Sequence, residues 1–304
     1  MSLDHLISRI HAELPELLIL ENEPMSKHTS FRIGGPVRAM VQPKSAEEVA
    51  SVCRLLRSAG VKPLILGNGT NLLVTDEPLN RIAVQFGERM SAVVPEGTDG
   101  LRAECGVTLA RLAGEAQRLG LAGLEFAHGI PGSLGGGVSM DAGAYGGELK
   151  DVVVSTRYLD EDLQERECVG AEHDFAYRHS RFSDTDCVIL ESAVRLTPDD
   201  PEAIMERMMT LREKRRASQP LEMPSAGSTF KRPVGGYAAA LIDQAGLKGY
   251  AIGGAQVSEK HGGFVINRGG ATFDDVLRLI DHIRETVYRN SGITLETEVK
   301  IIRE

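Results

Sequence analysis

The sequence has few cysteines and no long apolar run, and each absence excludes a class of protein. Its 304 residues include four cysteines, and none of them forms a C-x-x-C pair or a His/Cys spacing typical of a metal site. We therefore expect reduced structural thiols and no bound metal. No apolar run approaches the roughly 20 residues that a membrane-spanning helix needs, so we expect no membrane insertion.

Positive charge is also scarce. The 34 Lys and Arg residues are outnumbered by 43 Asp and Glu residues, which gives a net charge of −9. This balance excludes a nucleic-acid binder, which needs a basic surface. It does not exclude a nucleotide ligand, because backbone N–H groups and a few arginines can hold phosphates. The amphipathic N-terminus carries acidic residues, unlike a signal peptide, so we expect a soluble, cytoplasmic protein.

Glycine, in contrast, is abundant. The 33 glycines are not periodic, which excludes a collagen-like chain and favours close approach of the backbone to a ligand. They concentrate in two loops, residues 67–71 and residues 129–137. Neither loop is a Walker A sequence, and neither matches G-x-G-x-x-G followed by an acid about twenty residues later. Each loop alone is typical of a tight turn, whereas two in one half of the chain favour a nucleotide-like ligand.

Apolar periodicity predicts two successive α/β units followed by a second domain, for which the chain is long enough. The helices are expected at residues 1–20, 46–60, 109–119, 202–216 and 237–244 and after the capping residue Thr272. The strands are expected at residues 37–42, 63–66, 81–85, 101–104, 152–159, 188–196 and 294–302. The sequence Thr-Pro-Asp-Asp-Pro at 197–201 is the best candidate for a domain boundary.

Three polar residues stand out, and their chemistry stays open at this level. Ser228 follows a glycine and precedes Lys and Arg, so it can be a nucleophile, a proton donor or a turn residue. Arg178 lies among aromatic residues and is either a stacked structural residue or an anion clamp. In the expected C-terminal strand, period-two alternation places Glu296 and Glu298 on one face, which is either a solvated face or part of a site.

The sequence closely resembles the UDP-N-acetylenolpyruvoylglucosamine reductase family, flavoenzymes that make UDP-N-acetylmuramate for peptidoglycan. The matching stretches follow one another in the expected order along almost the whole chain, at residues 28–35, 67–74, 129–148, 177–182, 227–233, 245–267 and 295–302. The resemblance implies an α+β protein. Residues 1–199 would form a p-cresol methylhydroxylase-type (vanillyl-alcohol-oxidase-like) FAD-binding domain in two α/β lobes, about 1–86 and 87–199. Residues 200–304 would form an α+β substrate-binding domain.

The resemblance also implies the chemistry. In the family, NADPH reduces a non-covalently bound FAD and leaves, and the enolpyruvyl sugar nucleotide then enters the same cleft. Hydride passes from flavin N5 to the methylene carbon, and a serine protonates the neighbouring carbon. By the family match Ser228 is this proton donor, and Arg178 and Glu298 stabilise the intermediate. No obligate protein partner is implied.

Two further sets of residues are implied by position in the family motifs. The FAD diphosphate is expected on the two glycine loops, at Gly67, Asn68, Gly69, Thr70, Asn71, Ile130, Pro131, Gly132, Ser133, Gly135 and Gly136. The UDP-sugar is expected on Lys231, Arg232 and His261.

The chain also departs from the family pattern. Residues 193–208 leave no room for the tyrosine-bearing loop of longer members, so the chain resembles the shorter, second type. Arg232 and His261 replace amide side chains, Asp141 stands where asparagine is usual, and Gly137 where alanine is common. Two alternatives remain. One is a flavin oxidase or dehydrogenase of the same superfamily, with FAD attached through His28 or His128, and the other is a non-catalytic nucleotide-binding module.

Overall fold

The computed structural model describes residues 2–303, which form seven α-helices and nineteen strands. They divide into two compact units that do not follow chain order. The first unit contains residues 2–21, 39–68 and 81–214, and the second unit contains residues 22–38, 69–80 and 215–303. No helix among residues 2–303 has both the length and the apolar character to span a bilayer. The expected mixture of helices and strands is confirmed.

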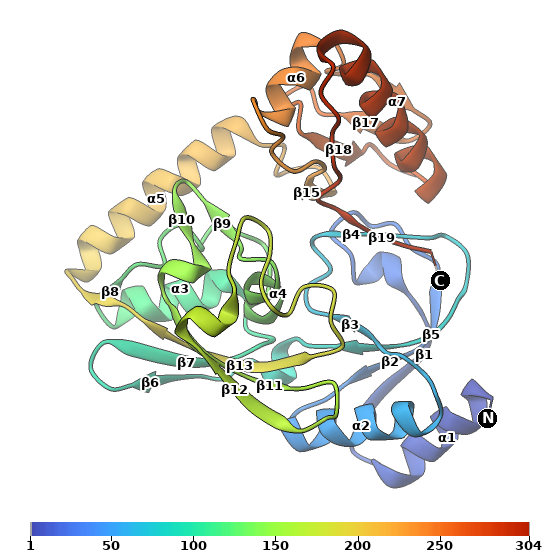
Figure 1. The fold of residues 1–304 in the computed structure, drawn as a ribbon, viewed down its shortest axis with the longest axis vertical. Helices are drawn as coiled ribbons and strands as arrows, with labels where there is room; N and C mark the ends of the chain where they lie inside the picture. Colours follow the sequence, from blue (N-terminus) through green and yellow to red (C-terminus); the bar gives the residue numbers. More distant parts are fainter. Residues whose placement is uncertain (1, 304) are drawn as a thin grey trace. The chain divides into compact units, whose positions relative to one another are not determined.

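A four-stranded sheet near the start of the chain has the order β1-β2-β5-β3. Its strands are β1 (Leu18–Pro24), β2 (Pro36–Gln42), β3 (Leu64–Leu66) and β5 (Leu79–Gln85). Two helices, α1 (Leu3–Glu13) and α2 (Ala46–Ser58), pack against each other on one side of this sheet (Figure 1). The Ser45 hydroxyl accepts a hydrogen bond from the Glu48 amide at 3.3 Å, so α2 begins at the expected cap.

The expectation of one helix over residues 1–20 is wrong. The helix ends at Glu13, and Leu14 leaves the helical conformation, with φ −129° and ψ 68°. Residue 15 is proline, and its ring disfavours helical backbone in the residue before it. The apolar residues that seemed to continue the helix belong to β1 instead.

An antiparallel five-stranded sheet forms the centre of the first unit, in the order β12-β11-β13-β7-β6. Its strands are β6 (Val93–Glu96), β7 (Gly100–Glu104), β11 (Val153–Leu159), β12 (Glu165–Val169) and β13 (Val188–Arg195). The three inner strands lie where the sequence predicts them. The helix α4 (Leu134–Ser139) packs on β7 and β13 (Figure 1), and α3 (Leu109–Arg118) begins at the expected cap, Thr108.

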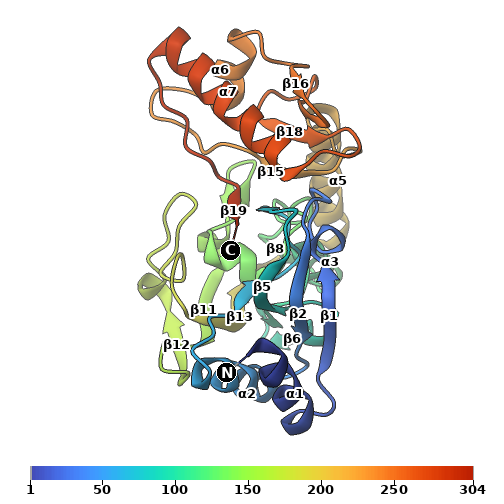
Figure 2. The same ribbon diagram turned by 90° about the vertical axis from the view of Figure 1, so that its right-hand side faces the viewer.

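The second unit has an antiparallel sheet in the order β15-β18-β17-β16. Its strands are β15 (Ser225–Ser228), β16 (Ala251–Ile252), β17 (Ala255–Val257) and β18 (Phe264–Asn267). The helices α6 (Ala238–Gln244) and α7 (Phe273–Ser291) lie on one side of it and complete a separate core (Figure 2). Thr272 and Asp275 form a reciprocal capping box at the start of α7, and Gly292 ends it with φ 70°.

The remaining elements are short, apart from one long helix. That helix is α5 (Pro201–Ser218). The short strands are β4 (Leu72–Val74), β8 (Leu121–Ala122), β9 (Gly143–Ala144), β10 (Gly147–Glu148), β14 (Thr197–Pro198) and β19 (Lys300–Ile302). The 3-10 turns are η1 (Met25–Lys27), η2 (Glu88–Met90), η3 (Leu149–Asp151) and η4 (Gly170–His173).

The expected strand over residues 294–302 is only partly present. β19 covers Lys300–Ile302 and pairs in parallel with β4, whereas residues 294–299 are irregular. The division of functions between residues 1–199 and 200–304 remains a prediction.

Candidate functional site

The two glycine loops touch each other in the first unit. Gly67 follows β3 directly, and Ser133 precedes α4. A Cβ atom added at Gly67 would lie 2.0 Å from the Ser133 hydroxyl oxygen, far inside van der Waals contact. The first loop also requires glycine at position 69, where φ is +59° and an added Cβ would lie 2.0 Å from the His28 carbonyl oxygen. The fold therefore brings together Gly67 and Ser133, which are 66 positions apart in sequence.

The second loop is held by main-chain hydrogen bonds to the segment before α3. The Leu134 amide donates to the Val107 carbonyl and the Gly135 amide to the Cys105 carbonyl, both at 2.8 Å. In the described part of the chain, the amides of Gly132, Ser133 and Gly136 have no main-chain acceptor. Three unpaired amides beside the close approach at Gly67 suit a diphosphate, whose oxygens accept hydrogen bonds. The residues present thus fit the phosphates of a dinucleotide such as FAD.

Ser228 and Glu298 lie on neighbouring segments of the second unit. Ser228 ends β15 and is opposite Phe264 of β18. The Glu298 amide donates to the carbonyl of Thr229, the residue after Ser228, at 2.9 Å. The Asn71 side-chain amide donates to the Glu298 carbonyl at 3.0 Å, so the end of the first glycine loop is attached to the same segment. The structure therefore places two of the three expected catalytic residues close together.

The expected shared face of Glu296 and Glu298 is not formed, because residues 294–299 are not a regular strand. The Glu296 side chain is 74% exposed, and its carboxylate lies 3.5 Å from the Lys231 ammonium. Glu298 is half-buried. Glu296 is therefore a solvated residue, whereas a place for Glu298 in a site stays a prediction.

Arg178 lies in the first unit, at the tip of a tight turn. Ala176 and His179 exchange two main-chain hydrogen bonds, which leaves Tyr177 and Arg178 as the two central residues. Arg178 has φ 57°, a left-handed conformation that is uncommon for a long side chain. Its guanidinium lies 5.1 Å from the centre of the Tyr177 ring and donates to the Asp141 carbonyl at 3.5 Å. Strained backbone of this kind is concentrated at functional sites, so it favours a function for the Arg178 side chain.

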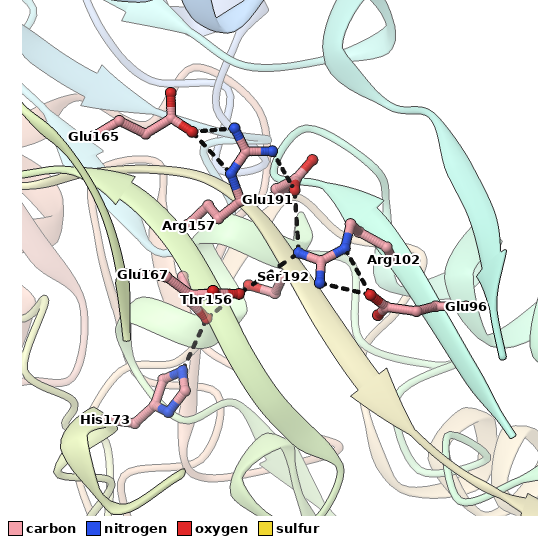
Figure 3. A network of polar contacts seen from close by, with 9 residues as sticks. All are labelled: Glu96, Arg102, Thr156, Arg157, Glu165, Glu167, His173, Glu191 and Ser192. Atoms are coloured by element: carbon pink, nitrogen blue, oxygen red, sulfur yellow. Dashed lines mark hydrogen bonds and ion pairs between the residues drawn. The ribbon is translucent and has the colours of Figure 1, made fainter. Parts of the chain in front are cut away.

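The segment that carries Arg178 is anchored by a buried histidine, His173. His173 is fully buried, and its Nδ1 lies 2.9 Å from the Gly170 carbonyl oxygen. Because a carbonyl only accepts, Nδ1 carries the proton, and Nε2 accepts from the Thr156 hydroxyl at 2.9 Å (Figure 3). Burial lowers the pKa of His173, so the ring is neutral.

The proposed sugar-nucleotide residues lie around β15 and the loop that follows it. The Arg232 guanidinium stacks 4.6 Å from the centre of the Tyr237 ring. The His261 Nδ1 accepts from the Gly263 amide at 3.2 Å, which leaves Nε2–H as a donor. Burial, with help from Lys248, lowers the pKa of His261. His261 also packs edge-on against Phe264, the residue opposite Ser228.

The two histidines considered for covalent FAD attachment, His28 and His128, lie in different environments. The His28 Nε2 lies 3.0 Å from the Glu23 carboxylate. Burial and the nearby Arg212 lower the pKa of His128.

Sequence reasoning missed one contact of an expected site residue in each unit, that of Asp141 with Arg178 in the first unit and that of Asn71 with Glu298 in the second. Asn71 was assigned only to the diphosphate, and Asp141 had no role. The only sequence signal for Asp141 was its place in the second glycine-rich stretch.

Comparison with known proteins identifies the family. Residues 37–168 match the family model of the FAD binding domain. Residues 219–302 match the model of the UDP-N-acetylenolpyruvoylglucosamine reductase C-terminal domain.

Relatives of known name match over nearly the whole chain. A UDP-N-acetylenolpyruvoylglucosamine reductase of Caldanaerobacter subterraneus subsp. tengcongensis is 44% identical over 299 residues, 98% of each chain. One of Syntrophomonas wolfei is 43% identical over 297 residues, 98% of this chain and 99% of the relative. The crystal structure of the Thermus caldophilus reductase superposes with a TM-score of 0.79 at 31% identity, covering 94% of this chain and 99% of that one. With this identity over almost its full length, the chain belongs to the UDP-N-acetylenolpyruvoylglucosamine reductase family.

Proposed function

We propose that this chain uses FAD and NADPH to reduce UDP-N-acetylenolpyruvoylglucosamine to UDP-N-acetylmuramate, a step in peptidoglycan precursor synthesis. Membership of the reductase family and the match to an FAD-binding domain support the reaction. The observation that carries the proposal is the contact of Gly67 with Ser133, which joins the two expected diphosphate loops. The four cysteines are free thiols, which agrees with a reducing compartment, and we propose the cytoplasm.

FAD, when bound and once reduced by NADPH, would supply the hydride that is added to the substrate's methylene carbon. The amides of Gly132, Ser133 and Gly136 would hold its diphosphate. The first loop contributes Gly67, Asn68, Gly69, Thr70 and Asn71 to the same role. The Asn71 carboxamide has a second task, because its bond to the Glu298 carbonyl ties the cofactor loop to the segment of a catalytic candidate.

Addition of hydride to the methylene carbon moves the alkene electrons onto the neighbouring carbon, which bears the carboxylate. We assign Ser228 to deliver a proton to that carbon, since a positioned O–H group prevents the reverse reaction. We assign Arg178 to offset the growing negative charge through its guanidinium. Glu298 lies beside the Ser228 strand, where it can restore the serine proton.

Lys231, Arg232 and His261 are the proposed contacts for the sugar nucleotide. Lys231 and Arg232 are cations that suit phosphates, and both lie within four residues of Ser228. The neutral His261 ring presents Nε2–H as a donor, which suits an uncharged acceptor of the sugar or the uracil better than it suits phosphate.

The proposal is tested by following NADPH absorbance with and without the enolpyruvyl sugar nucleotide. The Ser228→Ala variant should reduce its flavin with NADPH at the wild-type rate, because no substrate proton moves in that step. Its reoxidation by substrate should slow by about 10²- to 10⁴-fold, the usual contribution of a general acid. Wild-type reoxidation in this variant would refute the assignment of Ser228. The absence of substrate-dependent NADPH oxidation by the wild-type protein would refute the function itself.

A further inference from the structure

Asp141 is a buried acid directly after α4, and its side chain is only half satisfied. It is 0% exposed and has φ 44°. Its Oδ1 accepts a hydrogen bond from the Lys150 amide at 2.9 Å. Its Oδ2 is buried, and no hydrogen-bond partner for it exists among the described residues. A buried carboxylate with an unpaired oxygen is strongly disfavoured, whereas a neutral acid needs fewer partners.

The main chain around Asp141 supports the turn that carries Arg178. The Arg178 Nη1 donates to the Asp141 carbonyl at 3.5 Å. The hydroxyls of Ser180 and Ser183 donate to the Ser139 carbonyl at 2.8 and 2.7 Å. The Arg178 turn therefore rests on two residues at the end of α4, Ser139 and Asp141, and Asp141 is the one that contacts the guanidinium.

We propose that Asp141 is a positioning residue for Arg178. Its carbonyl orients the guanidinium, and the bond from its side chain to the Lys150 amide fixes the left-handed backbone that directs this carbonyl. Asp and Asn adopt this conformation more readily than other side chains, since their short polar groups bond to nearby backbone. The inference rests on the proposed role of Arg178 in the reaction.

The surroundings of Asp141 disfavour its charged form. Burial is the largest cause that raises the pKa of Asp141, and the nearby Glu148 and Asp151 carboxylates act in the same direction. The Lys150 amide and ammonium oppose them, and the Arg178 guanidinium lies against the main-chain carbonyl of Asp141. Because a carboxamide has nearly the shape of a carboxyl group and keeps an acceptor oxygen for the Lys150 amide, asparagine should replace Asp141.

The kinetic test compares Asp141→Asn, Asp141→Ala and Asp141→Gly. Asp141→Asn should reoxidise with substrate within about threefold of the wild-type rate. Asp141→Ala should be about 10²-fold slower, the loss that a 1 Å misplacement typically causes, with unchanged flavin content and NADPH step. Asp141→Gly tolerates the left-handed backbone but lacks the side-chain bond that fixes it, so it remains usable if the alanine variant does not fold, and it should also be slow.

The double variant Asp141→Ala/Arg178→Ala should be no slower than Arg178→Ala alone, because Asp141 acts only through Arg178. Three results would overturn the inference. These are wild-type rates in both Asp141→Ala and Asp141→Gly, losses that multiply in the double variant, and an asparagine variant as slow as the alanine variant.

A second measurement separates this inference from the proposed function. The ¹⁵N guanidinium signals of Arg178, assigned by their loss in Arg178→Lys, should be unchanged in Asp141→Asn and displaced or broadened in Asp141→Ala and Asp141→Gly. Asp151→Asn is the matched control, since the Asp151 carboxylate accepts from the Glu148 amide, away from Arg178. If Arg178→Ala keeps full activity, the catalytic role of Arg178 is wrong, and these signals alone decide the inference. Identical signals in wild type and Asp141→Ala would reject it.

Discussion

Replacement of Gly67 by alanine is the sharpest test of how the two glycine loops meet. The new Cβ would lie 2.0 Å from the Ser133 Oγ and 3.1 Å from the Ser133 Cβ. The Ser133 side chain must rotate away, and the two loops must also separate slightly. Overpacking of this size costs about 1–3 kcal/mol.

We expect this strain to appear mainly as weaker FAD binding, because the cofactor requires both loops in place. At 1.4 kcal/mol per tenfold change, the dissociation constant should rise about 5- to 150-fold. Titration of the apoprotein with FAD, followed by flavin fluorescence, measures this change. Urea unfolding of the apoprotein measures the part of the strain that remains without FAD.

Two further variants make this experiment decisive. Gly67→Ala/Ser133→Gly removes both atoms that the new methyl group meets, so it should regain most of the lost affinity. Gly114→Ala is the matched control, since a Cβ added there, within α3, meets nothing within 4 Å. It should leave FAD binding unchanged and stabilise the helix by up to about 1 kcal/mol. Wild-type affinity and stability in Gly67→Ala, or no recovery in the double variant, would show that the loops do not meet as described.

Two other predictions concern the five-stranded sheet and the support of Arg178. Glu191 accepts from Arg102 at 3.1 Å and from Arg157 at 2.8 Å, so Glu191→Gln should lower the urea unfolding free energy by about 1 kcal/mol (Figure 3). This loss should shrink in 1 M salt, and a loss independent of salt would argue against an ionic cause. Burial lowers the pKa of His173 in the folded protein. In the unfolded chain the same ring takes up a proton near its ordinary pKa of about 6.5, whereas in the folded protein it stays neutral to a lower pH. Stability should therefore fall as the pH drops from 7 to 5, and an equal slope in His173→Gln would contradict this account.

Much of the fold could be predicted from local sequence, because several elements carry their own signals. The caps Ser45, Thr108 and Thr272 mark the starts of three helices, and each hydroxyl accepts a backbone hydrogen bond as expected. The edge strands β6 and β12 were not predicted, since they are mostly exposed and have no continuous apolar pattern. The alternation at residues 294–299 was misleading, because only Leu295 and Val299 are buried there and the backbone is irregular.

The site was less accessible to sequence reasoning, because it depends on contacts between distant segments. Ser228 alone was indistinguishable from a turn residue. The Glu298 amide reaches the neighbouring Thr229 carbonyl only because the C-terminal segment returns beside β15. No local pattern encodes such a return, and the family resemblance supplied it indirectly. The support of Arg178 by Asp141 was invisible for the same reason.

Arg178 combines a proposed function of its side chain with a backbone conformation that lowers the stability of the folded protein, and this loss of stability can be measured. At φ 57° its backbone has a conformation that glycine adopts without strain and other residues do not. Arg178→Gly and Arg178→Ala lose the same side-chain contacts, but only glycine relieves the strain. Arg178→Gly should therefore be more stable than Arg178→Ala by about 1 kcal/mol, although alanine is normally the better residue.

Arg181 is the matched control, because it is not among the residues with positive φ. There the usual order should hold, with Arg181→Ala more stable than Arg181→Gly. Both Arg178 variants should lose rapid reoxidation by substrate and keep the NADPH step, which would separate the guanidinium's chemistry from its effect on folding. If alanine were the more stable residue at position 178 as well, the backbone there would be unstrained. Without strain, the backbone conformation would give no reason to assign a function to Arg178.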